Sequence, residues 1–147
     1  MSLIARLEDE VKEAMRSHDT VRRDTLRLIV NALKGAQKDL QRPLSDEEEL
    51  QVLQRERKRR IEAAEAFRKG DREEQAVAEE GELAVLQEFM PTPLSDGAIE
   101  EIVDNVIAEV GATSLRDFGR VMADVMHQCS GRADGSVIGQ LVREKLA

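Results

Sequence analysis

The stretch Met90-Pro91-Thr92-Pro93-Leu94 decides the architecture, because its two prolines interrupt a chain whose pattern is helical on both sides. Each proline biases the preceding residue away from the α conformation, so this stretch is expected to be extended. On either side, apolar residues recur every three or four positions, which is the period of an amphipathic helix. We therefore expect an all-α protein with an N-terminal domain over 1–90, a linker over 91–94 and a C-terminal domain over 95–147.

Four helices are expected before the linker, over about 2–17, 20–42, 45–70 and 71–90. Asp19 or Thr20 can cap the second helix, which ends before Pro43. Ser45-Asp46-Glu47-Glu48 has the pattern of a capping box, in which Ser45 and Glu48 each satisfy the other's backbone amide. Asp71 with Glu74 is expected to begin the fourth helix.

Three helices are expected after the linker. Ser95 can cap the first, and Gly111 can close it. Ser114-Leu115-Arg116-Asp117 has the pattern of a second capping box, and the helix that follows is expected to end at Gly131. Asp134 is expected to cap the last helix.

Composition excludes several classes of protein. The chain has 147 residues, a net charge of −8, one Cys, three Phe and no Trp or Tyr. A single cysteine excludes an internal disulfide framework and a cysteine-rich zinc module, and we expect neither metal nor cofactor. No apolar run approaches the ~20 residues of a membrane span, and the first residues lack a signal-peptide pattern, so a cytoplasmic protein is expected. The bases of a nucleic acid would find almost no aromatic side chain on this protein against which to stack.

The charge is unevenly distributed along the chain. Residues 51–72 hold eight basic and four acidic side chains, whereas residues 73–110 hold eleven acidic side chains and no Lys or Arg. The segment 111–147 is close to neutral, with five basic and four acidic side chains. An acidic total therefore does not exclude an RNA partner, but it restricts where RNA could touch the chain.

Several separated motifs point to a known family. The main ones are Ala112-Thr113-Ser114-Leu115-Arg116-Asp117-Phe118-Gly119-Arg120-Val121-Met122 and Gly131-Arg132-Ala133-Asp134-Gly135. Thr25-Leu26-Arg27-Leu28, Gly70-Asp71-Arg72, Glu82-Leu83-Ala84-Val85-Leu86 and the Met90-Pro91 junction occur in the same order. Together they resemble the GatB/YqeY family over essentially the whole chain, at the length of its free-standing YqeY-like members.

The resemblance implies a helical N-terminal domain followed by a small three-helix domain. A similar unit forms the C-terminal part of the B subunit of tRNA-dependent amidotransferases, where it is a tRNA-gripping appendage and a separate domain performs the amide transfer. The resemblance thus favours RNA binding over activity. The RNA-binding candidates are Arg116, Arg120, Arg132, Arg143 and Lys145, and the structural motif residues are Asp117, Phe118, Gly119, Gly131, Asp134 and Gly135.

A basic run in the third predicted helix has two interpretations. Arg55, Arg57, Lys58, Arg59 and Arg60 form a secondary basic patch that could contact phosphates. The same residues fit the solvated turn of a long helix whose charged heads pair with the acidic fourth helix. Helical spacing spreads these charges around the helix, so we favour the structural interpretation.

Two further features can be interpreted as sites. The glycine-containing turn around Asp134 could cradle a phosphate, but an Asp cap would occupy the free amides and repel an anion. His127 and Cys129, with Asp124 one turn earlier, could form a transient metal or thiol site, but a helix end is the favoured interpretation. No Ser–Lys or Cys–His–Asp arrangement for amide hydrolysis is recognisable.

The first hypothesis is a non-catalytic helical module that binds tRNA or another RNA, or assists tRNA-dependent amidotransfer. One alternative is a glutamine-dependent carbon–nitrogen ligase whose active site requires a partner subunit. The other is a protein-interaction adaptor that uses the acidic segment 73–110. The expected partners are tRNA or amidotransferase subunits, no DNA or membrane contact is expected, and a monomer is favoured.

Overall fold

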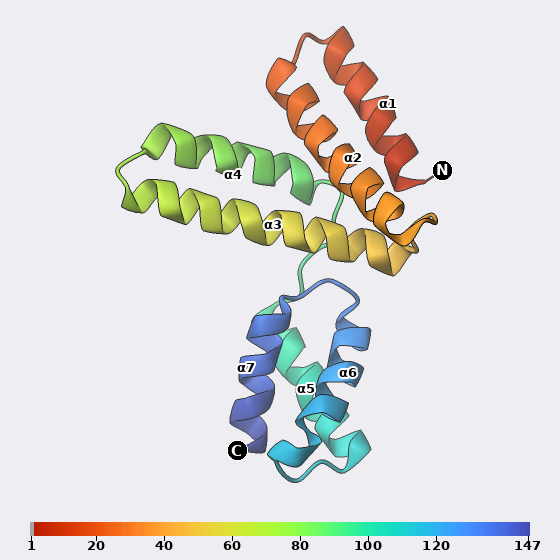
Figure 1. Ribbon diagram of the computed structural model, residues 1–147. Coiled ribbons are helices and arrows are strands. Elements are labelled where there is room, and N and C mark those ends of the chain that lie inside the picture. The colour runs from red at the N-terminus through yellow and green to blue at the C-terminus, as the bar shows by residue number, and fades with distance from the viewer. Residues whose placement is uncertain (1) are drawn as a thin grey trace. The chain divides into compact units, whose positions relative to one another are not determined.

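The computed structural model describes residues 2–147, and the regular elements in this range are all helical. They are α1 (Leu3–Arg16), α2 (Thr20–Leu40), α3 (Asp46–Lys69), α4 (Glu73–Gln87), α5 (Asp96–Val110), the 3₁₀ turn η1 (Leu115–Asp117), α6 (Phe118–Cys129) and α7 (Gly135–Leu146) (Figure 1). The all-α prediction is therefore confirmed for the described residues. The chain divides into two compact units between Met90 and Pro91. We call the part before this point unit 1 and the part after it unit 2.

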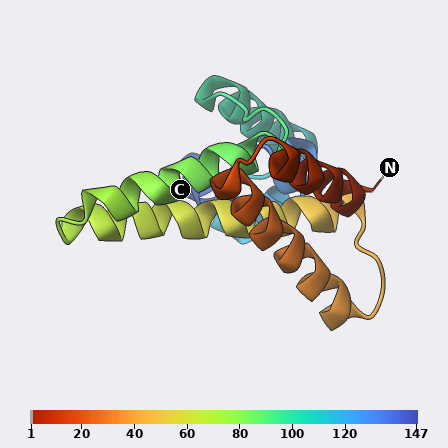
Figure 2. The same cartoon turned by 90° about the horizontal axis from the view of Figure 1, so that it is seen from above.

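Unit 1 consists of two helical hairpins, α1–α2 and α3–α4, that cross one another (Figures 1 and 2). Helix α2 contributes the centre of the core, because its Leu26, Ile29 and Leu33 are fully buried. They pack in one apolar cluster with side chains from the other three helices, namely Leu7, Ala14, Val52, Leu53 and Leu86. Each fully buried aliphatic side chain contributes roughly 1.5–3 kcal/mol, so the crossing is held mainly by apolar contact.

The α3–α4 hairpin continues beyond this core, and small and ionic side chains hold its far part together. Ala64 and Ala76 are buried there, although neither belongs to the main apolar cluster. Arg60 is also buried, with 5% of its surface exposed. Near the tip, Arg68 pairs with Glu73 and Glu80 of α4.

Arg60 makes a buried ionic contact between the two helices. Its Nη1 donates to Glu56 Oε2 at 2.7 Å, and its Nε lies 3.5 Å from Glu82 Oε2 on α4 without a hydrogen bond. Burial, followed by repulsion from Glu79, raises the pKa of Glu82. The basic run therefore does pair with the acidic helix, through its one buried member.

Unit 2 is a three-helix arrangement with an aliphatic core. Val103, Val121, Val125, Ile138 and Val142 are fully buried, and every one of the three helices contributes to this cluster. The expected end signals of α5 and α7 are present. They are the Ser95 hydroxyl accepting from Ala98 N, the left-handed Gly111, and the Asp134 carboxylate accepting from Ser136 N.

The predicted start and end of the fourth helix are wrong. Helix α4 begins at Glu73 and ends at Gln87, rather than running from Asp71 to about Met90. Asp71 does not cap it, because its backbone is left-handed with φ +58° and it forms the turn between α3 and α4. A short polar side chain is one of the few that tolerates this conformation. Asp71 therefore belongs to the turn between α3 and α4 and does not cap α4.

The second predicted capping box is also wrong. Ser114 Oγ accepts from the amide of Arg116, two residues on, while Asp117 Oδ2 accepts from the amide of Thr113 at 2.9 Å. The amide of Asp117 donates to the carbonyl of Ser114 at 3.0 Å and closes a 3₁₀ turn, so α6 begins only at Phe118. It ends at Cys129 rather than Gly131, because Ser130 already takes the left-handed conformation.

The Ser45 capping box is present as predicted. Glu48 N donates to Ser45 Oγ at 3.2 Å, and Ser45 N donates to Glu48 Oε1 at 2.9 Å. Arg42 adds two bonds to the same carboxylate, at 2.6 and 2.8 Å. Arg42 first, and then the Ser45 amide, lower the pKa of Glu48 to about 2.

Replacing Arg60 tests the ionic contact of the hairpin. We expect Arg60→Ala to lower the free energy of unfolding by about 3 kcal/mol, because Glu56 and Glu82 are left largely buried without their cation. Arg59→Ala is the matched control, since Arg59 is the adjacent arginine and its side chain is 75% exposed. Urea unfolding followed by far-UV circular dichroism measures both variants, and equal losses would contradict the assignment.

The Glu48 cap gives a pH-dependent prediction. Because the pKa of Glu48 is lowered from 4.5 to about 2, its stabilisation is complete above pH 4.5 and is lost as pH falls toward 2. Glu48→Gln should therefore melt at a lower temperature than the parent at neutral pH, and the gap should close in this acidic window. Glu47→Gln, one residue earlier, is the control with little expected effect. A gap that persists at the acidic end would refute the mechanism.

Candidate nucleic-acid interface

The five RNA-binding candidates divide between opposite ends of α6. Arg116 lies on η1, directly before α6, and Arg132 lies in the loop directly after it. Helix α6 has 12 residues and is therefore about 18 Å long. Arg116 and Arg132 therefore lie far apart on unit 2 and do not belong to one basic cluster.

Three arginines gather at the end of unit 2 that carries η1, and we call Arg116, Arg120 and Arg143 the η1-end arginines. Arg143 reaches this end from α7, where its Cζ lies 4.9 Å from the centroid of the Phe118 ring. All three residues are exposed. Among the described residues, the side chain of Arg116 donates no hydrogen bond.

The carboxylate of Asp117, which lies beside Arg116 and Arg120, is already engaged. Asp117 accepts from the amide of Thr113, and this bond is the largest cause that lowers the pKa of Asp117. Arg120 Nη2 lies 3.3 Å from Asp117 Oδ1 and also donates to the carbonyl of Val110 at 3.1 Å, at the end of α5. Arg120 is therefore partly a structural residue, whereas Arg116 and Arg143 keep most of their donors for a ligand.

Arg132 and Lys145 are held by contacts inside unit 2. Arg132 Nε donates to the carbonyl of Thr92 at 2.8 Å, and the amide of Leu94 donates back to the carbonyl of Arg132 at 2.9 Å. Lys145 Nζ lies 2.8 Å from both Glu100 Oε1 and Asp104 Oδ1. These partners are some 40 or more residues away in sequence, so no local pattern indicated them.

The motif residues of the 131–135 loop have structural roles. Gly131 has φ +76°, which suits glycine. Asp134 Oδ1 accepts from Ser136 N at 2.8 Å, as expected of a cap that leaves no room for a phosphate. A Cβ on Gly135 would lie 3.5 Å from Met126 Cε. Phe118 packs against the core of unit 2, and nothing in the structure requires glycine at 119.

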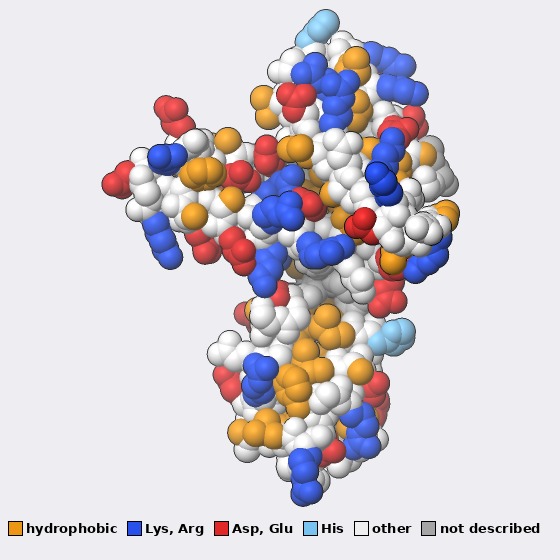
Figure 3. All heavy atoms as spheres, in the orientation of Figure 1, with side chains coloured by type: hydrophobic (Ala, Val, Ile, Leu, Met, Phe, Trp, Pro, Cys, Tyr) orange, Lys and Arg blue, Asp and Glu red, His pale blue; other side chains and the backbone are white. Residues whose placement is uncertain are grey.

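The secondary basic patch on α3 is dispersed. Arg55, Lys58 and Arg59 are exposed, Arg57 is half-buried and Arg60 is buried. On the face shown in Figure 3, basic and acidic side chains are interspersed rather than segregated. The patch therefore offers single charges around the helix, not a focused positive surface.

The thiol and metal alternatives have little support in this range. Cys129 is 1% exposed, and burial raises the pKa of its thiol, which is the opposite of what a reactive thiolate needs. In residues 2–147, no group of three His, Cys, Asp or Glu side chains could hold a metal ion. None of the helices described is long and apolar enough to span a membrane.

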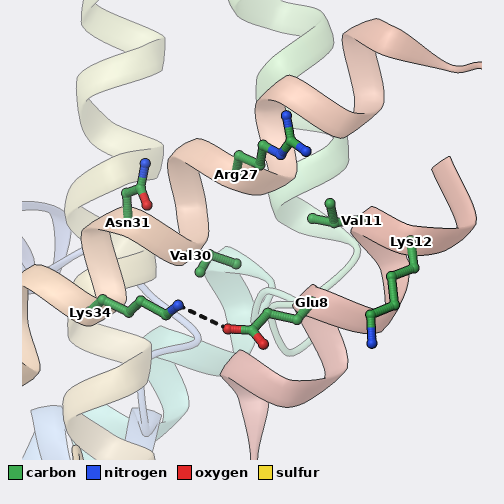
Figure 4. A pocket seen from close by; sticks show the side chains of 7 residues that line it. All are labelled: Glu8, Val11, Lys12, Arg27, Val30, Asn31 and Lys34. Atoms are coloured by element: carbon green, nitrogen blue, oxygen red, sulfur yellow. Dashed lines mark ion pairs between the residues drawn. The ribbon is translucent and has the colours of Figure 1, made fainter. Parts of the chain in front are cut away.

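A groove between α1 and α2, with a volume of about 420 Å³, was not expected from the sequence (Figure 4). Its lining residues are Glu8, Val11, Lys12, Arg27, Val30, Asn31 and Lys34. A second groove, of about 270 Å³, lies in unit 2 between α5 and α7 and is lined by Asp96, Ile99, Glu100, Val137, Gln140, Leu141 and Glu144. The motif Thr25-Leu26-Arg27-Leu28 is the only quoted sequence motif that overlaps the first groove, because Arg27 lines that groove.

Comparison with known proteins relates the chain to two groups. It is 28% identical over 146 residues to "Altered inheritance of mitochondria protein 41, mitochondrial" of Pyrenophora tritici-repentis, covering 97% of this chain and 80% of that protein. It is 29% identical over 124 residues to the E subunit of glutamyl-tRNA(Gln) amidotransferase of Thermococcus gammatolerans, covering 81% of this chain but 20% of that protein. The corresponding protein of Thermococcus sibiricus is 34% identical over 68 residues, which are 44% of this chain and 11% of that protein.

A family model described as "Yqey-like protein" matches residues 4–146, which include both units and every helix that carries a candidate residue. The chain belongs to the YqeY-like protein family.

Proposed function

We propose that the chain is a non-catalytic helical module that binds RNA, with tRNA as the first candidate. The observation that carries this proposal is the set of η1-end arginines, which are exposed, and the carboxylate beside Arg116 and Arg120 is already bonded. The two amidotransferase relatives support a connection with tRNA, since the name of their protein includes a tRNA. The family match covers the segment in which these arginines lie.

The contact would be made to the RNA backbone rather than to the bases. Guanidinium groups bind phosphate oxygens through paired N–H donors, and each neutralised phosphate releases a counterion. Arg143 is held over the Phe118 ring, which fixes the plane of its guanidinium while its N–H edges stay exposed. Three phenylalanines in 147 residues leave little scope for base stacking.

We also propose that unit 1 and unit 2 act as separate domains joined by the 91–94 linker. The two apolar clusters have no residue in common, so each unit has its own core. In this proposal, unit 2 supplies the RNA contact and unit 1 serves another partner. The cytoplasmic location stays a prediction, which imaging of the tagged chain in cells tests.

Titration with bulk tRNA at several salt concentrations tests the RNA proposal. We expect binding at low salt, with log K falling linearly as log salt rises. The double variant Arg116→Ala/Arg143→Ala should weaken binding and reduce the magnitude of the salt slope by about two, one for each lost phosphate contact. Lys69→Ala, an exposed basic residue at the end of α3, is the matched control.

Two results would overturn the proposal. No binding at low salt would show that the chain is not an RNA-binding module. A double variant with the affinity and slope of the Lys69→Ala control would remove the η1-end arginines from the interface.

A second candidate function is assistance to a tRNA-dependent amidotransferase, favoured by the two Thermococcus relatives. In that role the chain would position RNA or a subunit while its partner performs the chemistry. We expect the purified chain to release no ammonia from glutamine, because no Ser–Lys or Cys–His–Asp arrangement is recognisable in its sequence and its one cysteine is buried. An ammonia assay measures this, and glutaminase activity that survives further purification would establish an enzyme instead.

The adaptor alternative has weaker support, because the acidic segment is largely paired within the chain. Six of its eleven carboxylates make ion pairs with Arg22, Arg60, Arg68 or Lys145. They are Glu73, Glu80, Glu82, Glu88, Glu100 and Asp104. A basic partner would have to compete with these contacts, so a free acidic docking face is smaller than the sequence indicates.

A further inference from the structure

The groove between α1 and α2 has an apolar middle and charged ends. In this antiparallel pair, Lys34 of α2 faces Glu8 of α1, and the two form an ion pair of 3.0 Å that closes one end (Figure 4). Val11 and Val30 lie in the middle. At the other end, Arg27 Nη2 contacts Met15 Sδ at 3.6 Å, and Met15 is 49% exposed. The apolar strip of the groove thus consists of Val11, of Val30, which belongs to the core of unit 1 and is 6% exposed, and of Met15, which lies beside the lining residues.

The charge of the groove is positive and incompletely balanced. Its lining contains three cations, Lys12, Arg27 and Lys34, but one carboxylate, Glu8. Because Glu8 pairs with Lys34, Lys12 and Arg27 have no carboxylate partner among the residues that line the groove. Asn31 adds an exposed amide that can donate and accept.

The shape of the groove suits a helix. The lining residues of α2 extend from Arg27 to Lys34, which is two helical turns or about 10.5 Å. Two packed helices leave a long furrow between them, and an amphipathic helix fills such a furrow with side chains at spacings of three and four. A partner helix with apolar residues over Val11 and Val30, and carboxylates opposite Lys12 and Arg27, would satisfy both features.

RNA is a poorer occupant of this groove. Val11, Val30 and Met15 offer aliphatic surface, which neither stacks with bases nor replaces the hydration of phosphates and sugars. The two unmatched cations would bind at most one or two phosphates, while the apolar strip would be left exposed. An acidic amphipathic helix instead buries the strip and neutralises both cations.

We propose that the α1–α2 groove is a docking site for an acidic amphipathic helix of a partner protein. This site is distinct from the η1-end arginines, lies in unit 1, and does not depend on RNA binding. The α5–α7 groove of unit 2 has the opposite character, since Asp96, Glu100 and Glu144 line it. It should repel the same helix and therefore serves as an internal control.

The test is an NMR titration of the isotope-labelled full chain with a synthetic helical peptide. The probe is a capped peptide of about fifteen residues with leucines at spacings of three and four and glutamates beside them. The control peptide keeps every leucine and replaces the glutamates with lysines. We expect the acidic peptide to shift the amide resonances of Val11, Lys12, Arg27 and Val30, but not those of Ile99 and Val137.

Charge reversal then tests the residues of the rim. We expect Lys12→Glu/Arg27→Glu to weaken binding of the acidic peptide by about tenfold or more, because both attractive charges become repulsive. Lys38→Glu reverses one charge at an exposed position of α2 outside the groove and should bind as the parent does. Circular dichroism spectra that match the parent show that the exposed substitutions leave the helices intact.

Each other outcome overturns the proposal. Equal affinity for the acidic and basic peptides would show that charge does not select the occupant. Shifts concentrated outside the α1–α2 groove would place the peptide elsewhere, and a double variant that binds like Lys38→Glu would remove Lys12 and Arg27 from the site. If bulk tRNA, and not the peptide, shifts the four groove resonances, the groove belongs to an RNA surface instead.

Discussion

The packing of aliphatic side chains holds the helices of this chain together, and arginine side chains add polar contacts around the two cores. The chain has three Phe and no Trp or Tyr, so its two cores consist of aliphatic side chains. Guanidinium groups make the polar contacts around those cores. Arg22 binds Glu88, Arg60 joins α3 to α4, Arg120 binds the end of α5, and Arg132 fastens the 91–94 stretch. A planar group with five donors suits this task, because it can bond two partners at once.

This use of arginine changes how the charge of the chain should be interpreted. A sequence shows the number of cations, whereas binding depends on how many remain exposed and unpaired. Arg60 belongs to the most basic run of the sequence, yet it is 5% exposed and makes its contacts within the hairpin. Lys145 is held by two carboxylates of α5. Among the cations that make no ion pair in the described residues, Arg116 and Arg143 lie at η1, and Lys12 and Arg27 lie at the α1–α2 groove.

The sequence was sufficient for the features that depend on near neighbours. The helical period identified the seven helices, and Ser45, Ser95 and Asp134 cap the helices for which they were proposed. Asp71 shows where local patterns are ambiguous, because the residue types that cap helices also tolerate a left-handed turn. Ser114 and Asp117 have the spacing of a capping box, but their side chains accept from the amides of Arg116 and Thr113, and a 3₁₀ turn precedes α6. The site was less predictable, since the separation of Arg116 from Arg132 follows from the length and direction of α6.

The η1-end arginines and the α1–α2 groove differ in chemistry, and this difference is a reason to assign them to different ligands. The η1-end arginines present exposed guanidinium groups, where a phosphate can approach several donors without displacing apolar surface. The α1–α2 groove presents an aliphatic strip with cations at its rim, and its occupant must bury that strip as well as supply negative charge. RNA meets the first requirement and an acidic amphipathic helix meets the second. Because the surfaces lie in units with separate cores, substitutions at one should leave binding at the other intact.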